Sequence, residues 1–329
     1  MEIRYHSWQP LVLLVALSCI TLHDAQDAKP VPTATITEGD LRVIFRDNAR
    51  SPKVLSGLAS LVNQRDAPTF DAFDPESPGA SAGLNFEHII SGHKNPNNAF
   101  SPRHGKMRLL PDGKSALLVR EAEDDPWAIS STLKYTVTQP HYIDVDFRCV
   151  PHDKALFGKR GYAALFFANY MNEVEDIGVH FLGIEGTGQA EKWIRADAPK
   201  GHSDWNQGGT YRSCLASDLG YDADHNFRLN SWSYDYPRFT KPFYYGRAAK
   251  GMAFILMFNK MHTEEDEIRF SLFKFKLPRR KRPAWDFQYV IRKIEAAKEY
   301  GFQARLVWKK LVSAEDCLKE YESWAGSIR

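Results

Sequence analysis

Residues 142–149 read YIDVDFRC, and this stretch decides the fold class. Apolar and polar residues alternate strictly through it, which is the period of a β-strand with one face in the core and one face outside. The apolar set and the polar set are Ile143, Val145, Phe147 and Cys149 against Tyr142, Asp144, Asp146 and Arg148. We therefore expect an antiparallel sheet with a polar outer face.

Further strands follow on either side of this stretch. Pro111 to Lys114 reads as a hairpin turn between two apolar runs. The predicted strands are Leu41–Phe45, Met107–Leu110, Ser115–Arg120, Ser131–Thr138, His141–Val150, Gly161–Met171, Asp176–Ile184, Asn226–Tyr234, Gly251–Lys260, Glu267–Leu277, Trp285–Ile294 and Phe302–Leu311. Such a series with no second helical layer predicts an all-β protein, an antiparallel β-sandwich of the jelly-roll kind.

Two helices are expected beside the strands. Ser51-Pro52 begins a short N-terminal helix, because apolar residues follow it at helical spacing from Val54 to Val62. Ser313 caps a C-terminal helix, and Asp316 stands at the capping-box position. Its apolar stripe is Leu318, Tyr321 and Trp324.

The N-terminus has the pattern of an export signal. Arg4 and His6 precede an apolar run from Leu11 to Ile20, too short to span a membrane. We expect a signal peptide over residues 1–25, a disordered leader over 26–39 and one domain over 40–329, exported to the periplasm, the cell surface or the medium. No transmembrane segment is expected after signal removal. An uncleaved N-terminal anchor and a lipid anchor at Cys19 are the alternatives.

Composition and cysteines exclude several classes of protein. The chain carries 43 Lys and Arg against 41 Asp and Glu, so nothing favours a nucleic-acid partner. Cys149, Cys214 and Cys317 are far apart and odd in number after export, which gives neither a disulfide framework nor zinc spacing. The sequence contains no P-loop, nucleophile elbow or HExxH motif.

Polar strand faces supply the candidate catalytic residues. His180 lies on the face opposite Val179 and Phe181, and Tyr234 ends another alternating stretch. If these faces share one sheet with Asp144, Asp146 and Arg148, they form a cleft. The predicted catalytic set is then His180, Asp146, Arg148 and Tyr234, with Asp144 beside it. A solvated outer face is the alternative.

The segment 232–247, WSYDYPRFTKPFYYGR, is the most unusual in the chain. Aromatic rings with polar tips suit the apolar faces and hydroxyl edges of sugars. The predicted substrate-binding residues are Asn230, Trp232, Tyr236, Tyr245 and Arg247. A small hydrophobic lid is the alternative.

The loop 85–105 holds His88, His93 and His104, and Arg103 with His104 is predicted to face substrate. The histidine spacing matches no familiar metal site. Asp222 and Asp224 resemble half of a calcium loop but lack its Gly and distal Glu, so a structural calcium is a weak prediction and no other cofactor is expected.

Four stretches carry a resemblance to a family of exported bacterial proteins of unknown function: Ser77–Gly105, His141–Asn172, Tyr221–His262 and Glu265–Glu295. The family looks like the concanavalin A-like lectin/glucanase superfamily, which implies a carbohydrate partner. That superfamily includes glycoside hydrolases, polysaccharide lyases and lectin-like modules, but fold alone does not fix activity. We expect a protein that cleaves a polysaccharide. The alternative is a non-catalytic carbohydrate-binding protein of the cell surface.

Overall fold

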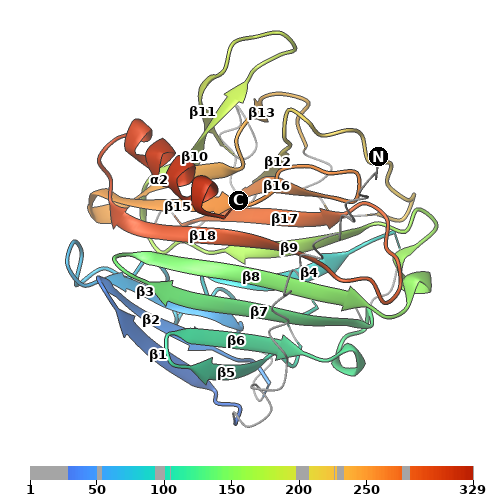
Figure 1. Cartoon of the computed structure of the whole chain (residues 1–329), viewed down its shortest axis with the longest axis horizontal. Coiled ribbons are helices and arrows are strands. Elements are labelled where there is room, and N and C mark those ends of the chain that lie inside the picture. Colours follow the sequence, from blue (N-terminus) through green and yellow to red (C-terminus); the bar gives the residue numbers. More distant parts are fainter. Residues whose placement is uncertain are drawn as a thin grey trace, which may run out of the picture.

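A computed structural model describes residues 29–49, 54–92, 101–103, 105–197, 207–225, 227, 233–275 and 282–328. Two antiparallel sheets form a sandwich, and one helix, α2 (Ala314–Ser327), lies against its outside (Figure 1). The predicted antiparallel β-sandwich with a C-terminal helix is confirmed.

The eight-stranded sheet brings together strands from both halves of the chain. Its strands, in spatial order, are β1 (Thr33–Glu38), β2 (Leu41–Arg46), β3 (Gly57–Asn63), β4 (Leu84–Ile90), β9 (Ala163–Asn169), β17 (Pro283–Ile291), β16 (Asp266–Lys274) and β12 (Gln207–Tyr211). The central strands β9 and β17 are buried along their whole length, so neither face of this sheet is open at its middle.

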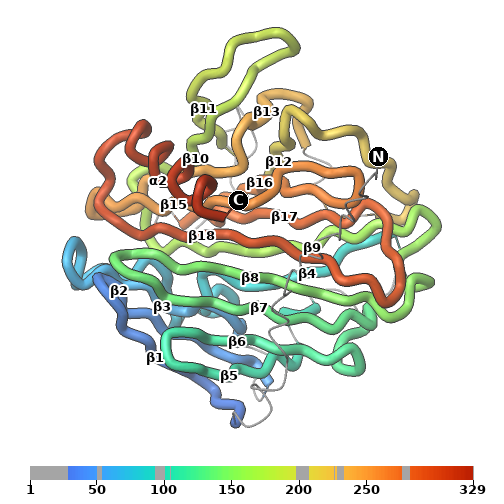
Figure 2. The backbone as a smooth tube through the Cα atoms, viewed as in Figure 1, coloured from blue at the N-terminus to red at the C-terminus, as the bar shows by residue number. Residues whose placement is uncertain are grey.

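The ten-stranded sheet carries the stretch 142–149 at its middle. In order its strands are β11 (Lys192–Ala196), β10 (Val174–Ile184), β14 (Phe243–Ala248), β15 (Met252–Phe258), β18 (Tyr300–Lys310), β8 (Tyr142–Pro151), β7 (Ile129–Thr138), β6 (Ser115–Arg120) and β5 (Arg108–Asp112), with β13 (Arg238–Phe239) pairing with β10. The tube in Figure 2 shows β10 and β11 extending beyond the sandwich as a hairpin.

Aromatic side chains from both sheets meet in the core. Phe147 of β8 contacts Phe86 of β4 and Phe167 of β9, with ring centroids 5.2 and 5.1 Å apart. The seven core residues that the alternation predicts are all buried: Phe147, Val179, Phe181, Phe254, Leu256, Phe270 and Leu272. The predicted phases of the four strands that carry these residues are therefore correct.

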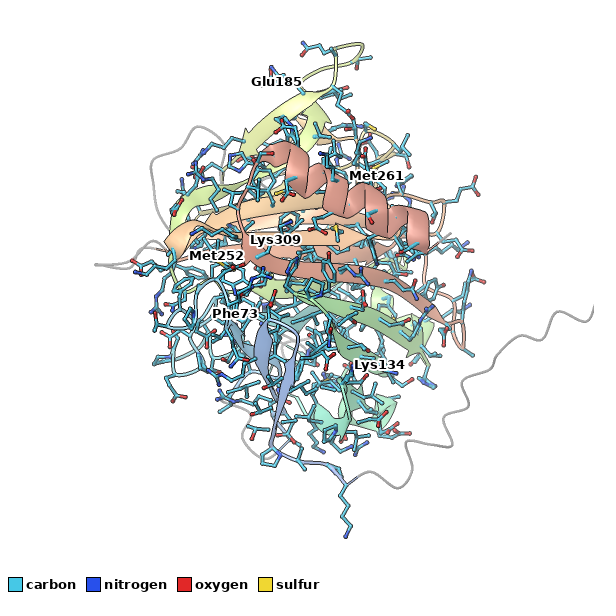
Figure 3. All side chains as sticks on the ribbon, turned by 60° about the vertical axis from the view of Figure 1, so that its left-hand side comes forward. Phe73, Lys134, Glu185, Met252, Met261 and Lys309 are labelled. Atoms are coloured by element: carbon cyan, nitrogen blue, oxygen red, sulfur yellow. The ribbon has the colours of Figure 1, made fainter. Side chains whose placement is uncertain are left out.

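Helix α2 packs on the outer face of the ten-stranded sheet. Trp324 is buried, and Tyr321 stacks on Phe243 of β14 at 4.9 Å. The Ser313 hydroxyl accepts a hydrogen bond from the Asp316 N–H at 3.1 Å, as the capping pattern predicts. Figure 3 shows the helix lying across the strands beside Lys309, whose ammonium pairs with Glu320 at 2.5 Å.

Two predictions for the N-terminal part are wrong. Residues 57–63 form strand β3 instead of a helix. Leu58 and Leu61 face the central core while Ala59 packs on the other side of the sheet, and a strand buried on both faces imitates helical spacing. Thr33–Glu38, expected within a disordered leader, pairs with β2 as strand β1. The proposed cap at Ser51-Pro52 lies outside the described residues.

Candidate functional site

The outer face of β8 carries ion pairs exposed to solvent. Asp146 binds Arg148 at 2.7 Å, and Asp144 binds Arg305 of β18 at 2.7 Å. The side chains of Arg148 and Asp146 are 43% and 36% exposed. Pairs of this exposure contribute little to stability and leave no enclosed space for a substrate. They correspond to the solvated face that was the alternative interpretation.

His180 lies on the same face of the same sheet but far from Arg148. Its row across the sheet passes through Tyr245 and reaches Tyr142 in β8. Three strands separate β10 from β8, a lateral distance of about 19 Å, and Arg148 is a further six residues along the strand, about 20 Å. The predicted common cleft is therefore not formed.

His180 has its own surroundings at the edge of the sheet. Its ring stacks on Tyr245 at 4.8 Å, and its Nε2 lies 3.8 Å from Asp176, which binds Arg195. Burial lowers the pKa of His180, and Asp176 opposes this shift only in part. Arg247 pairs with Glu175 at 3.2 Å on the same side.

The remaining predicted residues are dispersed. Tyr234 packs against Tyr211 at the edge of the eight-stranded sheet, and the Tyr236 hydroxyl contacts Thr187 in the β10–β11 region. Asn230, Trp232 and His104, like most of the predicted strand 226–234, lie outside the described residues.

The calcium prediction gains no further ligand from the structure. The Asp222 carboxylate accepts the Arg160 N–H at 3.2 Å. Within the part of the chain that the structure describes, no group of three or more His, Cys, Asp or Glu side chains is arranged to hold a metal ion.

A second polar surface, which the sequence analysis missed, lies on the outer face of the eight-stranded sheet. In β17 the core residues Phe287 and Tyr289 alternate with Asp286 and Gln288, which face the other way. Neighbouring strands add similar groups, and all of them are buried: Asn85, Glu87, Thr210, Glu267, Arg269, Ser271, Asp286 and Gln288. Buried polar groups need hydrogen-bond partners, whereas those on the solvated face of β8 can bond to water. The outer face of the eight-stranded sheet is therefore the better candidate for a functional site.

Tyr170 lies at one end of this face, between a carboxylate and a guanidinium group. Its hydroxyl lies 2.8 and 3.0 Å from the two carboxylate oxygens of Glu87. The Arg103 guanidinium donates to the same hydroxyl at 3.1 Å and also binds Glu87. Glu87 is fully buried, so the three side chains form one enclosed network.

The backbone fixes this network in place. Tyr170 follows β9 and bridges to Ala284 of β17, and its N–H donates to Gly83 O at 3.2 Å. The Arg103 N–H donates to Glu87 O at 3.0 Å, which holds residues 101–103 alongside β4. A bulge at Glu87 sets the local direction of the strand. Four segments distant in sequence therefore meet at the tyrosine.

A pocket of about 240 Å³ opens on Tyr170. Arg282 stands in its wall and binds Asp74 at 2.7 Å, while its buried Nε has no hydrogen-bond partner among the residues that the structure describes. Phe275 contacts the Tyr170 ring at 5.8 Å. The lining residues are Asp74, Ser77, Pro78, Gly79, Ala80, Arg103, Tyr170, Met171, Phe275, Arg282 and Pro283. Two guanidinium groups and an aromatic wall thus surround a space of the size of a sugar unit.

Burial controls protonation around this pocket. It raises the pKa of Tyr170, and Arg103 opposes the rise in part, so the phenol is protonated at neutral pH. Burial lowers the pKa of His88 to about 3, which leaves its ring neutral beside Glu87, with Nε2 3.4 Å from the carboxylate. Burial also raises the pKa of Asp286 well above its ordinary value.

The arrangement suits proton transfer next to an anion. The Tyr170 proton can pass to Glu87 across a 2.8 Å hydrogen bond, and Arg103 would stabilise the resulting phenolate. Arg282 also lines the pocket, and its guanidinium is the kind of group that binds an anion there. Among the described residues that were predicted from sequence, Arg103 is the one that lines this pocket, and its contact with substrate stays a prediction.

The comparisons with known proteins assign no family. No family model and no curated protein matches the chain. Among solved structures, a heparinase III has a TM-score of 0.41 at 8% identity, over 85% of this chain and 34% of its own. A heparan sulfate lyase from Pedobacter heparinus gives 0.41 at 9%, over 86% and 35%. A GalM/aldose epimerase homologue from C. elegans gives 0.40 at 9%, over 85% and 100%.

These are distant similarities in the arrangement of strands. The chain spans about a third of the heparinase and lyase chains it matches. Separately, no helix among the described residues is long and apolar enough to cross a membrane.

Proposed function

We propose that this protein binds an acidic polysaccharide at the Tyr170 pocket and cleaves it by β-elimination. One observation carries the proposal: the Tyr170 hydroxyl is held between Glu87 and Arg103, and Tyr170, Arg103 and Arg282 line the same pocket. Elimination next to a uronate carboxylate needs a proton acceptor and a cation that neutralises the carboxylate, and these residues supply both.

In the proposed reaction, Tyr170 passes its proton to Glu87 as substrate binds. The phenolate then removes the proton from C5 of the uronate unit, while Arg282 binds the carboxylate and stabilises the negative charge that develops there. The C4–O bond breaks and a C4=C5 double bond forms. Tyr170 delivers the C5 proton to the departing oxygen, and Glu87 returns its proton to Tyr170. Every proton is accounted for, and no cofactor is needed.

Hydrolysis fits this pocket less well than elimination. A glycoside hydrolase places two carboxyl groups on opposite sides of the bond. Among the described residues that line the pocket, Asp74 is the one carboxylate, and it binds Arg282 at 2.7 Å. Asp286, whose raised pKa would suit an acid, is fully buried beside the Asn169 N–H and does not line the pocket.

The test is a panel of acidic and neutral polysaccharides assayed by two readouts. Reducing ends report any cleavage, and ultraviolet absorbance of the unsaturated uronate reports elimination alone. We expect both signals with an acidic polymer. Tyr170→Phe should lower turnover by about 10²–10⁴-fold while substrate still binds.

Tyr236→Phe is the matched control, because it removes a tyrosine hydroxyl predicted from sequence to bind substrate but placed away from the pocket. It should keep full turnover. Reducing ends without ultraviolet absorbance would mean hydrolysis, and binding without either signal would mean the lectin-like alternative. Either result contradicts elimination at Tyr170.

A further inference from the structure

Both guanidinium groups of the Tyr170 pocket already have carboxylate partners. Arg103 pairs with Glu87, and Arg282 pairs with Asp74 at 2.7 Å. These four groups together carry no net charge, although two arginines line the pocket. A further anion therefore gains a full ion pair in the pocket only by taking the place of one of the two carboxylates.

The two pairs differ in how firmly the carboxylate is held. The Glu87 side chain is 1% exposed, and both Arg103 and the Tyr170 hydroxyl bind it. The Asp74 side chain is 28% exposed, and among the described residues Arg282 is the one partner of its carboxylate. Displacing Glu87 would break a buried network, whereas Asp74 can turn into solvent.

Asp74 can leave Arg282 without any change in the fold. The preceding residue, Phe73, is fully buried, and its ring lies 6.2 Å from that of Phe254 in the core, so the backbone is anchored there. The Asp74 carbonyl accepts a hydrogen bond from the Ser77 N–H at 2.9 Å, which holds the start of the turn. A change of side-chain rotamer is then enough to release the guanidinium.

We propose that Asp74 is an internal competitor for Arg282: it neutralises the guanidinium in the free protein and is displaced by the carboxylate of a bound uronate. This inference rests on the proposed function and deepens it, because it names the residue that limits uronate affinity. The exchange replaces one ion pair by another, so Arg282 is never left uncompensated. An uncharged sugar has no group that can replace the Asp74 carboxylate, so its affinity should not depend on Asp74.

The test measures binding by titration calorimetry in full-length protein carrying Tyr170→Phe, which slows turnover. The probes are tetrasaccharides of two uronate polymers, hyaluronan and alginate, and their carboxyl-reduced, uncharged counterparts. Asp74→Asn keeps the shape of the side chain and removes its charge. We expect it to raise affinity for the uronate probe about tenfold at low salt, and less at high salt, because salt screens the ion pair that Asp74 no longer opposes. Affinity for the uncharged probes should stay the same.

Glu76→Gln is the matched control, because Glu76 belongs to the same loop and lies 4.0 Å from an arginine, Arg46, but does not line the Tyr170 pocket. It should leave every affinity unchanged. Asp74→Ser, a second way to remove the charge, should show the same gain as Asp74→Asn.

The outcomes separate this inference from the proposed function. Weaker uronate binding in Asp74→Asn would mean that Asp74 positions Arg282 instead of competing for it, and would refute the inference. Unchanged uronate binding, or an equal gain in Glu76→Gln, would refute it as well, while binding at the pocket would still stand. If no uronate probe binds to any variant, the proposed function itself fails.

Discussion

Glu267 offers a sharp test of how the buried polar face is stabilised. Its carboxylate is fully buried and binds Arg269, which is 1% exposed, and Arg292 at 3.2 Å. Burial alone would raise the pKa of Glu267, but Arg269, His262 (Nδ1 3.7 Å from the carboxylate) and Arg292 together lower it to about 2. The substitution Glu267→Gln removes the charge and keeps the shape.

The expected loss of stability follows from two independent lines. A pKa lowered from 4.5 to about 2 corresponds to roughly 3 kcal/mol of stabilisation at neutral pH. Removing one partner of a buried pair, which leaves Arg269 uncompensated, typically costs about 3–5 kcal/mol. We therefore expect Glu267→Gln to lower the free energy of unfolding by about 3–5 kcal/mol.

Urea unfolding at neutral pH measures this loss as a shift of the midpoint at constant slope. Asp146→Asn is the control, because it breaks an ion pair of similar geometry that is exposed to solvent, and it should cost under about 1 kcal/mol. The folded pKa of Glu267 is depressed, so its contribution is present above about pH 4.5 and is lost as the pH falls toward 2. The difference between wild type and Glu267→Gln should shrink over that window. Equal losses in the two variants would refute the reasoning.

Four further outcomes are expected. Phe147→Ala should cost about 3–5 kcal/mol in urea unfolding, since Phe147 lies at the centre of the core, and a cost under 1 kcal/mol would contradict its packing. Deleting α2 should lower the melting temperature while leaving substrate choice unchanged, because its buried Trp324 packs on the sheet away from the Tyr170 pocket. Turnover of an acidic polymer should change little with pH around neutrality, because burial raises the pKa of Tyr170 and the phenolate is formed by internal proton transfer to Glu87; a steep rise with pH would argue against that transfer. N-terminal sequencing of secreted protein should show cleavage near Ala25, as the apolar run before it predicts.

Alternation of polar and apolar residues was enough to predict the class of fold. Strands such as 142–151 and 300–310 have one face in the core and one outside, so their period is visible in the sequence. Strand β3 was missed because it is buried on both sides and its apolar run carries no such period. Strand β4 alternates only over its first four residues, before the register shift between Phe86 and His88. The C-terminal helix was predicted because its cap and stripe are local signals.

The candidate site depended on information that the sequence does not hold. Tyr170, Glu87, Arg103 and Arg282 come from four distant segments, and only the pairing of β4, β9 and β17 brings them together. A signal was present, since Asp286 and Gln288 alternate with core aromatics as Asp144 and Asp146 do.

Alternation in the sequence predicts that one face of a strand is polar. Whether that face is an ordinary surface or a candidate site depends on how many protein groups surround each polar side chain. Asp146 lies on an open face, where water solvates it and its ion pair with Arg148 contributes little to stability. Glu87 lies on an enclosed face, where a carboxylate is tolerated only because Arg103, Tyr170 and His88 surround it. The same sequence pattern thus has opposite physical meanings on the two sheets. Enclosure, which depends on distant segments, is the reason that we place the proposed proton transfer and anion binding at the face of β4 and β9.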